Sequence, residues 1–179
     1  MKALLVALSM VVVTIPVLAD EAPIPVEIRN ARITDEGILT GGQPTVAQLT
    51  ALKKAGYKTI INLRPETEVE IAFEKTKDET LHYDERTAAL KAGFQYISLP
   101  IGSAEDLTAD NARALDQMLK NLGDGVILHC GSGNRVGALM ALRAFHIQNK
   151  SSQEALELGR AAGLTKLEPV ISELLSPSN

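Results

Sequence analysis

The sequence predicts a single α/β domain in which a mainly parallel central sheet is flanked by helices. From Thr45 onward, short apolar stretches alternate with helix patterns, which is typical of parallel strands covered on both faces. Pro and Gly residues fall between these stretches without forming a linker, and the chain shows no internal repeat. With 179 residues, the chain has the length of one domain that can bury a hydrophobic core.

The N-terminal residues predict a secretory signal peptide. Lys2 precedes an apolar or small stretch that ends with Val17-Leu18-Ala19, before Asp20. A retained membrane anchor is the alternative, but the stretch is short for a span of about 20 residues and lacks a basic flank. We therefore expect cleavage after Ala19, a single periplasmic or secreted domain of residues 20–179, and no membrane span once the signal is removed.

The first elements are placed by local signals. Residues 25–34 and 37–42 alternate in polarity around Asp35-Glu36-Gly37, which predicts a hairpin. Thr45 and Gln48 have capping-box spacing, so a helix is expected from there to Gly56. A short apolar strand over 57–63 follows, and Arg64-Pro65 ends it.

The charged segment 66–80 is expected to be a solvated excursion with a weak helical pattern. After it, helices and strands alternate again. Their predicted ranges are a helix over 84–93, a strand over 94–101, a helix that starts from Thr108, a strand over 126–129, and helices over Val136–Gln148, Ser152–Ala162 (capped by Ser151 and Glu154) and Glu168–Leu175.

Composition excludes some partners and raises a question about the thiol. The net charge is −4 and there is no Trp, so the basic, base-stacking surface that binds nucleic acid is missing, and nucleic acid is not expected as a partner. Cys130 is the only cysteine, which permits no internal disulfide. Because an accessible lone thiol is open to oxidation in an oxidising compartment, Cys130 is expected to be either buried or used.

The surroundings of Cys130 favour use. It follows a strand and precedes the turn Gly131-Ser132-Gly133-Asn134, which leads into a helix. In such a turn the backbone N–H groups and the helix dipole favour an anion, and Arg135 adds a bidentate fork for an oxyanion. The same groups stabilise thiolate over thiol, with His129 as a further candidate for orienting it. We predict that the turn residues bind an anion beside a nucleophile that attacks phosphorus or sulfane sulfur.

Two other strand ends are expected at the same edge of the sheet, because ligands bind at the carboxyl ends of parallel strands. Arg64 follows the first strand and either reaches a bound anion or is a surface arginine. Residues 102–106 follow the second strand.

The segment "HCGSGNRVG" resembles the phosphate loop of the cysteine-dependent phosphatases, whose pattern is His-Cys, five residues, then Arg. Together with "GILTGGQPT", "TIINLRPETE", "FQYISLPI" and "EALELGRAAGL", it resembles the bacterial phosphatase-like domain named after beta-lactamase hydrolase, over most of residues 27–172. The resemblance implies a dual-specificity-phosphatase-like fold, Cys130 as nucleophile, Arg135 as oxyanion ligand, and a phosphorylated or small anionic substrate. It also supports contact between Arg64 and the anion.

The sequence departs from the broader phosphatase pattern in two ways. Four residues, not five, separate Cys130 from Arg135, and this shorter ring resembles the loop of rhodanese-type sulfurtransferases. The hydroxyl residue that usually follows the Arg and helps phosphocysteine break down is replaced by Val136-Gly137, with Ser132 as a candidate substitute inside the loop.

The general acid is the least defined part of the predicted site. The resemblance places the acid at Gly102-Ser103, where this sequence has no acidic residue. Two acidic residues follow slightly later in the same loop, so Asp106 is the first candidate and Glu105 the second. Each has a competing role as an N-terminal charge on the following helix.

The sequence thus predicts a phosphatase-like hydrolase that acts on a phosphate monoester through a phosphocysteine at Cys130. Sulfur transfer through a Cys130 persulfide and a non-catalytic anion-binding module are the alternatives. We expect no cofactor and no metal site, because no Cys, His or carboxylate stands at metal-ligand spacing around His82 or His146 in the sequence.

Overall fold

A five-stranded sheet organises the computed structural model, which describes residues 24, 26–68 and 79–176. The strand order is β1-β2-β5-β3-β4, with β1 antiparallel to β2 and every other neighbouring pair parallel. The strands are β1 (Arg32–Ile33), β2 (Leu39–Gly41), β3 (Thr59–Asn62), β4 (Gln95–Ser98) and β5 (Val126–His129). The predicted α/β class with a mainly parallel sheet is confirmed.

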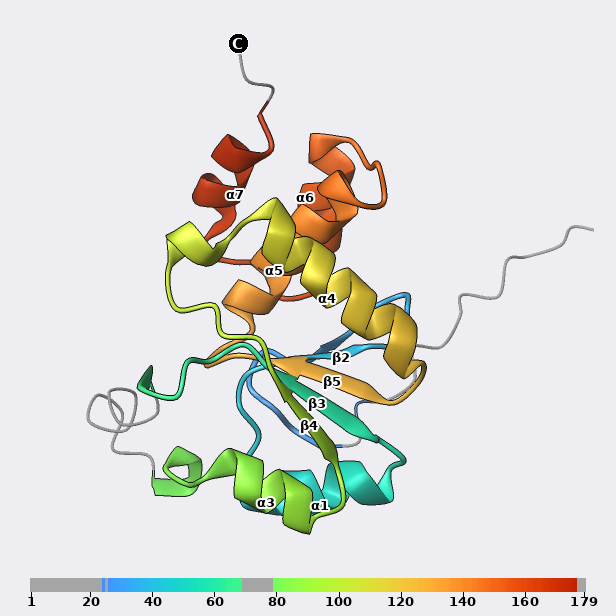
Figure 1. Cartoon of the computed structure of the whole chain (residues 1–179), viewed down its shortest axis with the longest axis vertical. Coiled ribbons are helices and arrows are strands. Elements are labelled where there is room, and N and C mark those ends of the chain that lie inside the picture. The colour runs from blue at the N-terminus through green and yellow to red at the C-terminus, as the bar shows by residue number, and fades with distance from the viewer. Residues whose placement is uncertain (1–23, 25, 69–78, 177–179) are drawn as a thin grey trace, which may run out of the picture.

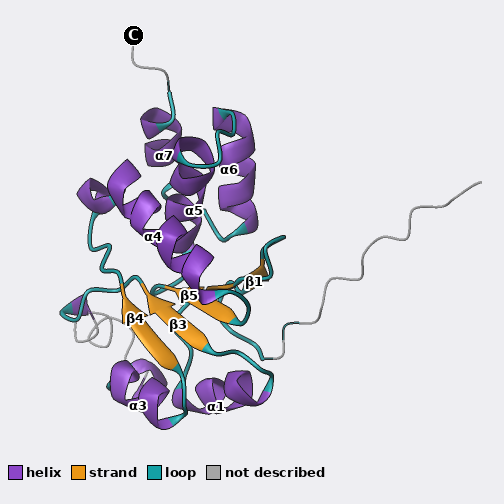
Figure 2. Ribbon diagram, turned by 45° about the vertical axis from the view of Figure 1, so that its right-hand side comes forward, coloured by secondary structure: helices purple, strands orange, loops and turns teal. Residues whose placement is uncertain are grey.

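Helices cover both faces of this sheet, as Figures 1 and 2 show. On one face lie α1 (Val46–Lys54) and α3 (Glu85–Lys91). On the other lie α4 (Ala109–Leu122), α5 (Asn134–His146), α6 (Ser152–Ala161) and α7 (Glu168–Leu174). Helix α5 is the central one and contacts α4, α6 and α7. Two single turns of 3₁₀-helix, Glu79–Leu81 and Ala104–Asp106, complete the regular structure of the described residues.

The apolar strands supply both halves of the core. Ile60 and Ile127 point to the cluster under α1 and α3, whereas Ile61 and Leu128 point to the cluster under α4 and α5. Successive residues of a strand face opposite sides of the sheet, so a strand buried on both faces must be apolar at every position. This explains why the strands are read from the sequence as continuous apolar runs.

The local capping signals predict helix starts well. Thr45 and Gln48 form the expected capping box, Thr108 accepts a hydrogen bond from the backbone of α4, and Ser151 and Glu154 form a second box. Helix α5 starts at Asn134, two residues before its predicted start, directly after Gly133. The helix ends differ from the predicted ones by one or two residues, as is usual for frayed termini.

Two predicted segments fall largely outside the described residues. The signal peptide expected over 1–19 lies there entirely, as does the part of the charged segment that spans 69–78. Among the described residues, no helix is both long enough and apolar enough to cross a membrane.

A buried ionic cluster ties α5 to its neighbours. Arg143 donates through Nε to Asp116 on α4 (2.9 Å) and through Nη1 and Nη2 to Glu36 in the β1–β2 turn (2.6 and 3.0 Å). Hydrogen bonds from Arg143 lower the pKa of Glu36. Burial raises the pKa of Asp116, but its bonds to Lys120 and Arg143 outweigh burial and leave that pKa lowered. Helix α5 is therefore fixed at its C-terminal end by charges that come from two other elements.

Helices α5 and α6 approach each other through a small residue on each. A Cβ added to Gly137 would lie 1.9 Å from the backbone nitrogen of Leu164, and one added to Gly159 would lie 2.9 Å from the carbonyl oxygen of Gly137. No side chain fits at position 137 unless the backbone after α6 moves.

We therefore expect Gly137→Ala to destabilise the fold by about 1–3 kcal/mol or more, because the new methyl group must push a packed backbone segment away. Thermal unfolding of the two proteins measures the loss. Gly102→Ala is the matched control, since a Cβ there meets its neighbours only at 3.5 and 3.6 Å, an ordinary contact distance. Equal unfolding temperatures for Gly137→Ala and the parent chain would contradict the close helix contact.

Candidate active site

Cys130 lies where β5 ends, in a tight loop that runs into α5. Its Sγ accepts a hydrogen bond from the backbone N–H of Gly133 at 3.2 Å. Gly133 has φ of +87°, and a Cβ there would lie 3.0 Å from Asn30 Nδ2, so backbone conformation and space both favour glycine. The thiol is 1 % exposed. Cys130 is thus buried, as abundance alone suggests for a free cysteine, yet its sulfur faces a helix N-terminus.

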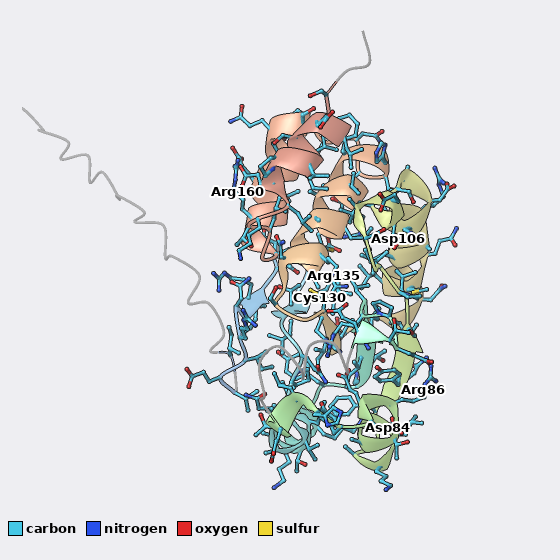
Figure 3. All side chains as sticks on the ribbon, turned by 90° about the vertical axis from the view of Figure 1, so that its left-hand side faces the viewer. Asp84, Arg86, Asp106, Cys130, Arg135 and Arg160 are labelled. Carbon is cyan, nitrogen blue, oxygen red and sulfur yellow. The ribbon has the colours of Figure 1, made fainter. Side chains whose placement is uncertain are left out.

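Arg135 lies one residue inside α5, next to Cys130 in Figure 3. Its Nη1 donates to the carbonyl oxygen of Ile101 (2.7 Å) and to Glu68 Oε2 (2.6 Å), and its Nη2 donates to Glu68 Oε1 (2.6 Å). Burial lowers the pKa of Arg135, but the bonds to Glu68 and the charge of Cys130 outweigh burial and raise that pKa. The guanidinium therefore stays charged beside the sulfur.

Arg64 is brought to the same edge of the sheet, and its guanidinium contacts Glu68. It donates from Nη2 to the carbonyl oxygen of Glu68 (3.3 Å), and its Nε lies 3.5 Å from Glu68 Oε1. Its own N–H donates to Asn62 Oδ1 at 2.8 Å. Of its two predicted settings, the surface one is wrong, because Arg64 is 3 % exposed. Direct contact between Arg64 and an anion stays a prediction.

The side chains of the loop 131–134 play unequal parts. Asn134 Oδ1 accepts hydrogen bonds from the backbone of Thr165 (2.8 Å) and Leu167 (3.3 Å), so this side chain holds the segment between α6 and α7 and faces away from an anion site. Asn30 Nδ2 donates to the carbonyl oxygen of Ser132 at 3.2 Å and supports the loop from behind. Anion binding by residues 131–134 stays a prediction, and the backbone N–H groups of the loop are the donors it would use.

Asp106 is engaged within its own loop. Its Oδ2 accepts hydrogen bonds from the N–H groups of Gly102 (2.8 Å) and Ser103 (3.0 Å), and these bonds lower its pKa. A hydrogen bond from Ser103 likewise lowers the pKa of the exposed Glu105. Both carboxylates are thus stabilised in the ionised form, whereas a general acid must carry a proton. The contacts lend the acid role no support, and they lie in the turn before α4 rather than at the N-terminus of α4, where the competing role was predicted.

His129, the last residue of β5, belongs to a buried polar network under the loop. Its Nδ1 lies 3.3 Å from the carbonyl oxygen of Cys130 and its Nε2 lies 2.8 Å from Glu85 Oε1. Glu85 Oε2 accepts from the Tyr96 hydroxyl (3.4 Å), which in turn accepts from Asn62 Nδ2 (2.8 Å). Asn62 also holds the backbone of Arg64, so the network links the cysteine loop to the loop after β3.

Sequence reasoning missed three residues that shape this site: Asn30, Glu68 and Glu85. Asn30 and Glu85 meet their partners 102 and 44 positions away in the chain, and no local pattern marks such a contact. Glu68 lies in the charged segment 66–80 that was expected to be solvated, although it closes the quoted stretch "TIINLRPETE". That motif was the one signal that could have identified it.

Among the described residues, no group of three or more His, Cys, Asp or Glu side chains is placed to hold a metal ion. The contacts of the described residues bring together a thiol, a backbone donor and an arginine bound by a carboxylate.

The fold that carries the cysteine loop is shared with solved structures of phosphatases. TpbA of P. aeruginosa has the same fold, with a TM-score of 0.58 at 18% identity over 82% of this chain and 83% of that one. A Neisseria meningitidis protein assigned as a phosphatase is similar at a TM-score of 0.59 and 23% identity, over 79% of this chain and 95% of that one.

The family follows from the sequence comparison. The chain belongs to the family described as "Beta-lactamase hydrolase-like protein, phosphatase-like domain", whose sequence model matches residues 30–146. The beta-lactamase hydrolase-like protein of Xylella fastidiosa strain 9a5c is 29% identical over 134 residues, which cover 74% of this chain and 29% of that protein. The namesake from Agrobacterium fabrum is 31% identical over 60% of this chain and 23% of its own length. The chain thus spans less than a third of these relatives.

We expect Cys130 to react as a thiolate at neutral pH, because the Gly133 N–H, the start of α5 and Arg135 all favour the charged form. Iodoacetamide should alkylate Cys130 in the folded protein at pH 7 faster than it alkylates free cysteine. A rate at or below that of free cysteine would return Cys130 to the class of inert buried cysteines.

Arg135→Lys should remove most turnover and weaken binding of phosphate or sulfate by about 1.5–3 kcal/mol, while the fold survives. Lysine keeps the charge but not the paired donors of the guanidinium. Turnover and calorimetric titration with phosphate measure the two effects, and circular dichroism checks the fold. Near-full turnover and affinity in Arg135→Lys would make residue 135 only a charge on the helix surface.

Proposed function

We propose that this protein hydrolyses phosphate monoesters through a phosphocysteine at Cys130. The observation that carries the proposal is the position of the Cys130 sulfur, 3.2 Å from the N–H of Gly133 and beside the Arg135 guanidinium, at the N-terminus of α5. A thiolate and an oxyanion site in one loop are what nucleophilic attack on phosphorus needs.

In the first step, the Cys130 thiolate attacks phosphorus while the bond to the leaving oxygen breaks. The leaving oxygen takes a proton from water, or departs as the phenolate where it is weakly basic, and the phosphoryl group remains on sulfur. In the second step, water attacks phosphorus, the S–P bond breaks, inorganic phosphate leaves and the thiolate is restored. Arg135 and the loop N–H groups hold the phosphoryl oxygens in both steps.

The second step lacks the usual hydroxyl. Position 136 is a buried valine, and position 137 must be glycine because α6 and the segment after it leave no room for a side chain. Ser132 remains the candidate substitute inside the loop. The first step also lacks a protonated acid, because Asp106 caps its turn as a carboxylate. Slow turnover and a preference for leaving groups that need little protonation follow from these two features.

Sulfur transfer is the second candidate, and the shorter ring between Cys130 and Arg135 is the observation that favours it. In that reaction Cys130 takes the outer sulfur of thiosulfate, sulfite leaves without needing an acid, and the persulfide passes its sulfur to a nucleophile. A non-catalytic module that binds anions at this loop without turnover is the third candidate.

We place the substrate outside the cytoplasm, in keeping with the signal peptide expected over residues 1–19. One structure of TpbA holds phosphotyrosine, which is a phosphorylated aryl group. A phosphorylated or small anionic substrate is our proposal for this chain as well.

The leaving group separates the candidates. Aryl phosphates expel a weakly basic oxygen, whereas phosphoserine expels a strongly basic one that depends on a general acid. We expect slow turnover of p-nitrophenyl phosphate, far slower turnover of phosphoserine, and loss of both in Cys130→Ser. Asp106→Asn should leave the ratio of the two rates unchanged, because its carboxylate serves the turn.

Phosphate release and thiocyanate formation from thiosulfate and cyanide are measured side by side. Thiocyanate formation that depends on Cys130, with no such release of phosphate, would replace the phosphatase proposal by sulfur transfer. Silence in both assays, with measurable phosphate binding, would leave the non-catalytic module.

A further inference from the structure

A cavity of about 550 Å³ lies at the carboxyl edge of the sheet, where β3 and β4 end and α3 begins. It is on the same side of the molecule as the cysteine loop, as the positions of Arg86 and Cys130 in Figure 3 show. Cavities of this size hold small organic groups. Its lining includes Asn62, Arg64, Tyr83, Glu85, Arg86 and Tyr96.

Arg64 connects this cavity to the cysteine loop. The residue is buried and lines the cavity, and its Nη2 donates to the carbonyl oxygen of Glu68 at 3.3 Å. Glu68 lies against the loop, since a Cβ added to Gly131 would be 3.3 Å from Glu68 Oε1. One molecule can therefore occupy the loop with one end and the cavity with the other.

Most of the carboxylates that line the cavity are bound by neighbouring residues. Glu85 Oε1 lies 2.8 Å from His129 Nε2. Asp84 accepts hydrogen bonds from the N–H and the hydroxyl group of Thr87, at 2.9 and 2.6 Å. Of the carboxylates in the lining, Glu66 alone has no such partner among the described residues, and it is exposed.

Two arginines in the lining keep donors that no carboxylate uses. Arg86 is exposed and forms no ion pair with a carboxylate of the described residues. Its guanidinium lies over the ring of Tyr96, 5.2 Å from the ring centroid. The buried Nε of Arg64 forms no hydrogen bond within the described part of the chain. Because guanidinium donors are left over and most carboxylates are not, the cavity favours an oxyanion.

Tyrosine rings supply the apolar part of the lining. The hydroxyl group of Tyr83 donates to the carbonyl oxygen of Pro44, and that of Tyr96 is held by Asn62 and Glu85. Burial raises the pKa of both tyrosines, so both rings stay neutral. Apolar surface and a free cation in one cavity suit an organic group with a negative charge at its end.

We propose that this cavity binds the leaving group of the substrate, and that the leaving group carries a carboxylate, which Arg86 binds. The tyrosine rings contact the carbon skeleton between the carboxylate and the phosphoryl group. A singly charged carboxylate suits the cavity better than a second phosphate, because the charge of Glu66 opposes that of Arg86. The inference rests on the proposed function, since it places the phosphoryl group of the same molecule at the cysteine loop, and it names the substrate class as phosphate esters of an acidic alcohol or phenol.

The test measures binding to the Cys130→Ser protein, which cannot form the phosphocysteine. The probes are phenyl phosphates that carry a carboxymethyl, carboxyethyl or carboxypropyl chain para to the phosphate, so that the carboxylate reaches successively further. The primary amide of each probe has the same size without the charge. Calorimetric titration should show that at least one acid binds about three- to tenfold more tightly than its amide.

Arg86→Gln, introduced into the same protein, should abolish this preference, so that acid and amide bind within about twofold of each other. Lys91→Gln is the matched control, because it removes a positive charge from the same helix at an exposed residue outside the cavity. It should leave the preference for the acid unchanged. An equal loss in both variants would indicate attraction by overall charge rather than contact with Arg86, and would overturn the proposal.

Three other results would also overturn it. Acid and amide that bind equally at all three chain lengths would exclude a carboxylate subsite. A preference that survives Arg86→Gln would place the carboxylate elsewhere. Tighter binding of a probe with a phosphonate in place of the carboxylate would assign the cavity to a doubly charged group.

Turnover by the parent chain separates this inference from the proposed function. Hydrolysis of p-nitrophenyl phosphate without any preference for the acid probes would refute the inference and leave the proposed function standing. A preference for the acid that depends on Arg86, in a chain that hydrolyses no phosphate ester, would refute the proposed function and leave the carboxylate subsite standing.

Discussion

The site depends on the sharp turn between β5 and α5. Gly133 takes a left-handed conformation there, which aims its N–H at the sulfur of Cys130 and starts the helix at the next residue. Space requires this as well as backbone geometry, because Asn30 and the backbone of Gly41 fill the volume where a side chain would stand. The hairpin, which is distant in sequence, therefore forms the back wall of the cysteine loop.

The close contact between α5 and α6 explains a departure from the phosphatase pattern. Position 137 touches the backbone of Leu164 so closely that only hydrogen fits, and Val136 is fully buried. A hydroxyl side chain at either position would face packed core rather than the loop. Positions 136 and 137 could serve either the packing of the C-terminal helices or the chemistry at the loop. In this chain both residues serve the packing.

The local signals predict most of the fold, whereas the site needs long-range contacts. Each capping box, at Thr45 and at Ser151, spans only four residues of sequence and predicts its helix start correctly. The apolar runs predict the strands. Cys130 and Arg135 are found from the loop in the same way. Glu68 was not, because its partner Arg135 lies 67 positions away and a charged segment looks the same whether one of its carboxylates binds solvent or an arginine. Asp106 shows the converse, since a carboxylate at a loop is equally consistent with an acid and with a cap until its bonds are seen.

Buried contacts run from His129 through Glu85 and Tyr96 to Asn62. They determine which residues would have to accompany the cysteine loop if the site were grafted onto another protein. The contacts cross from β5 to α3, then to β4 and β3, and end at the backbone that carries Arg64. If the nine residues "HCGSGNRVG" were grafted onto the sheet of another α/β protein, His129 would lose its contact with Glu85. Arg135 would lose its ion pair with Glu68. A graft with the function of this site would have to carry residues from three strands and one helix on the opposite face of the sheet.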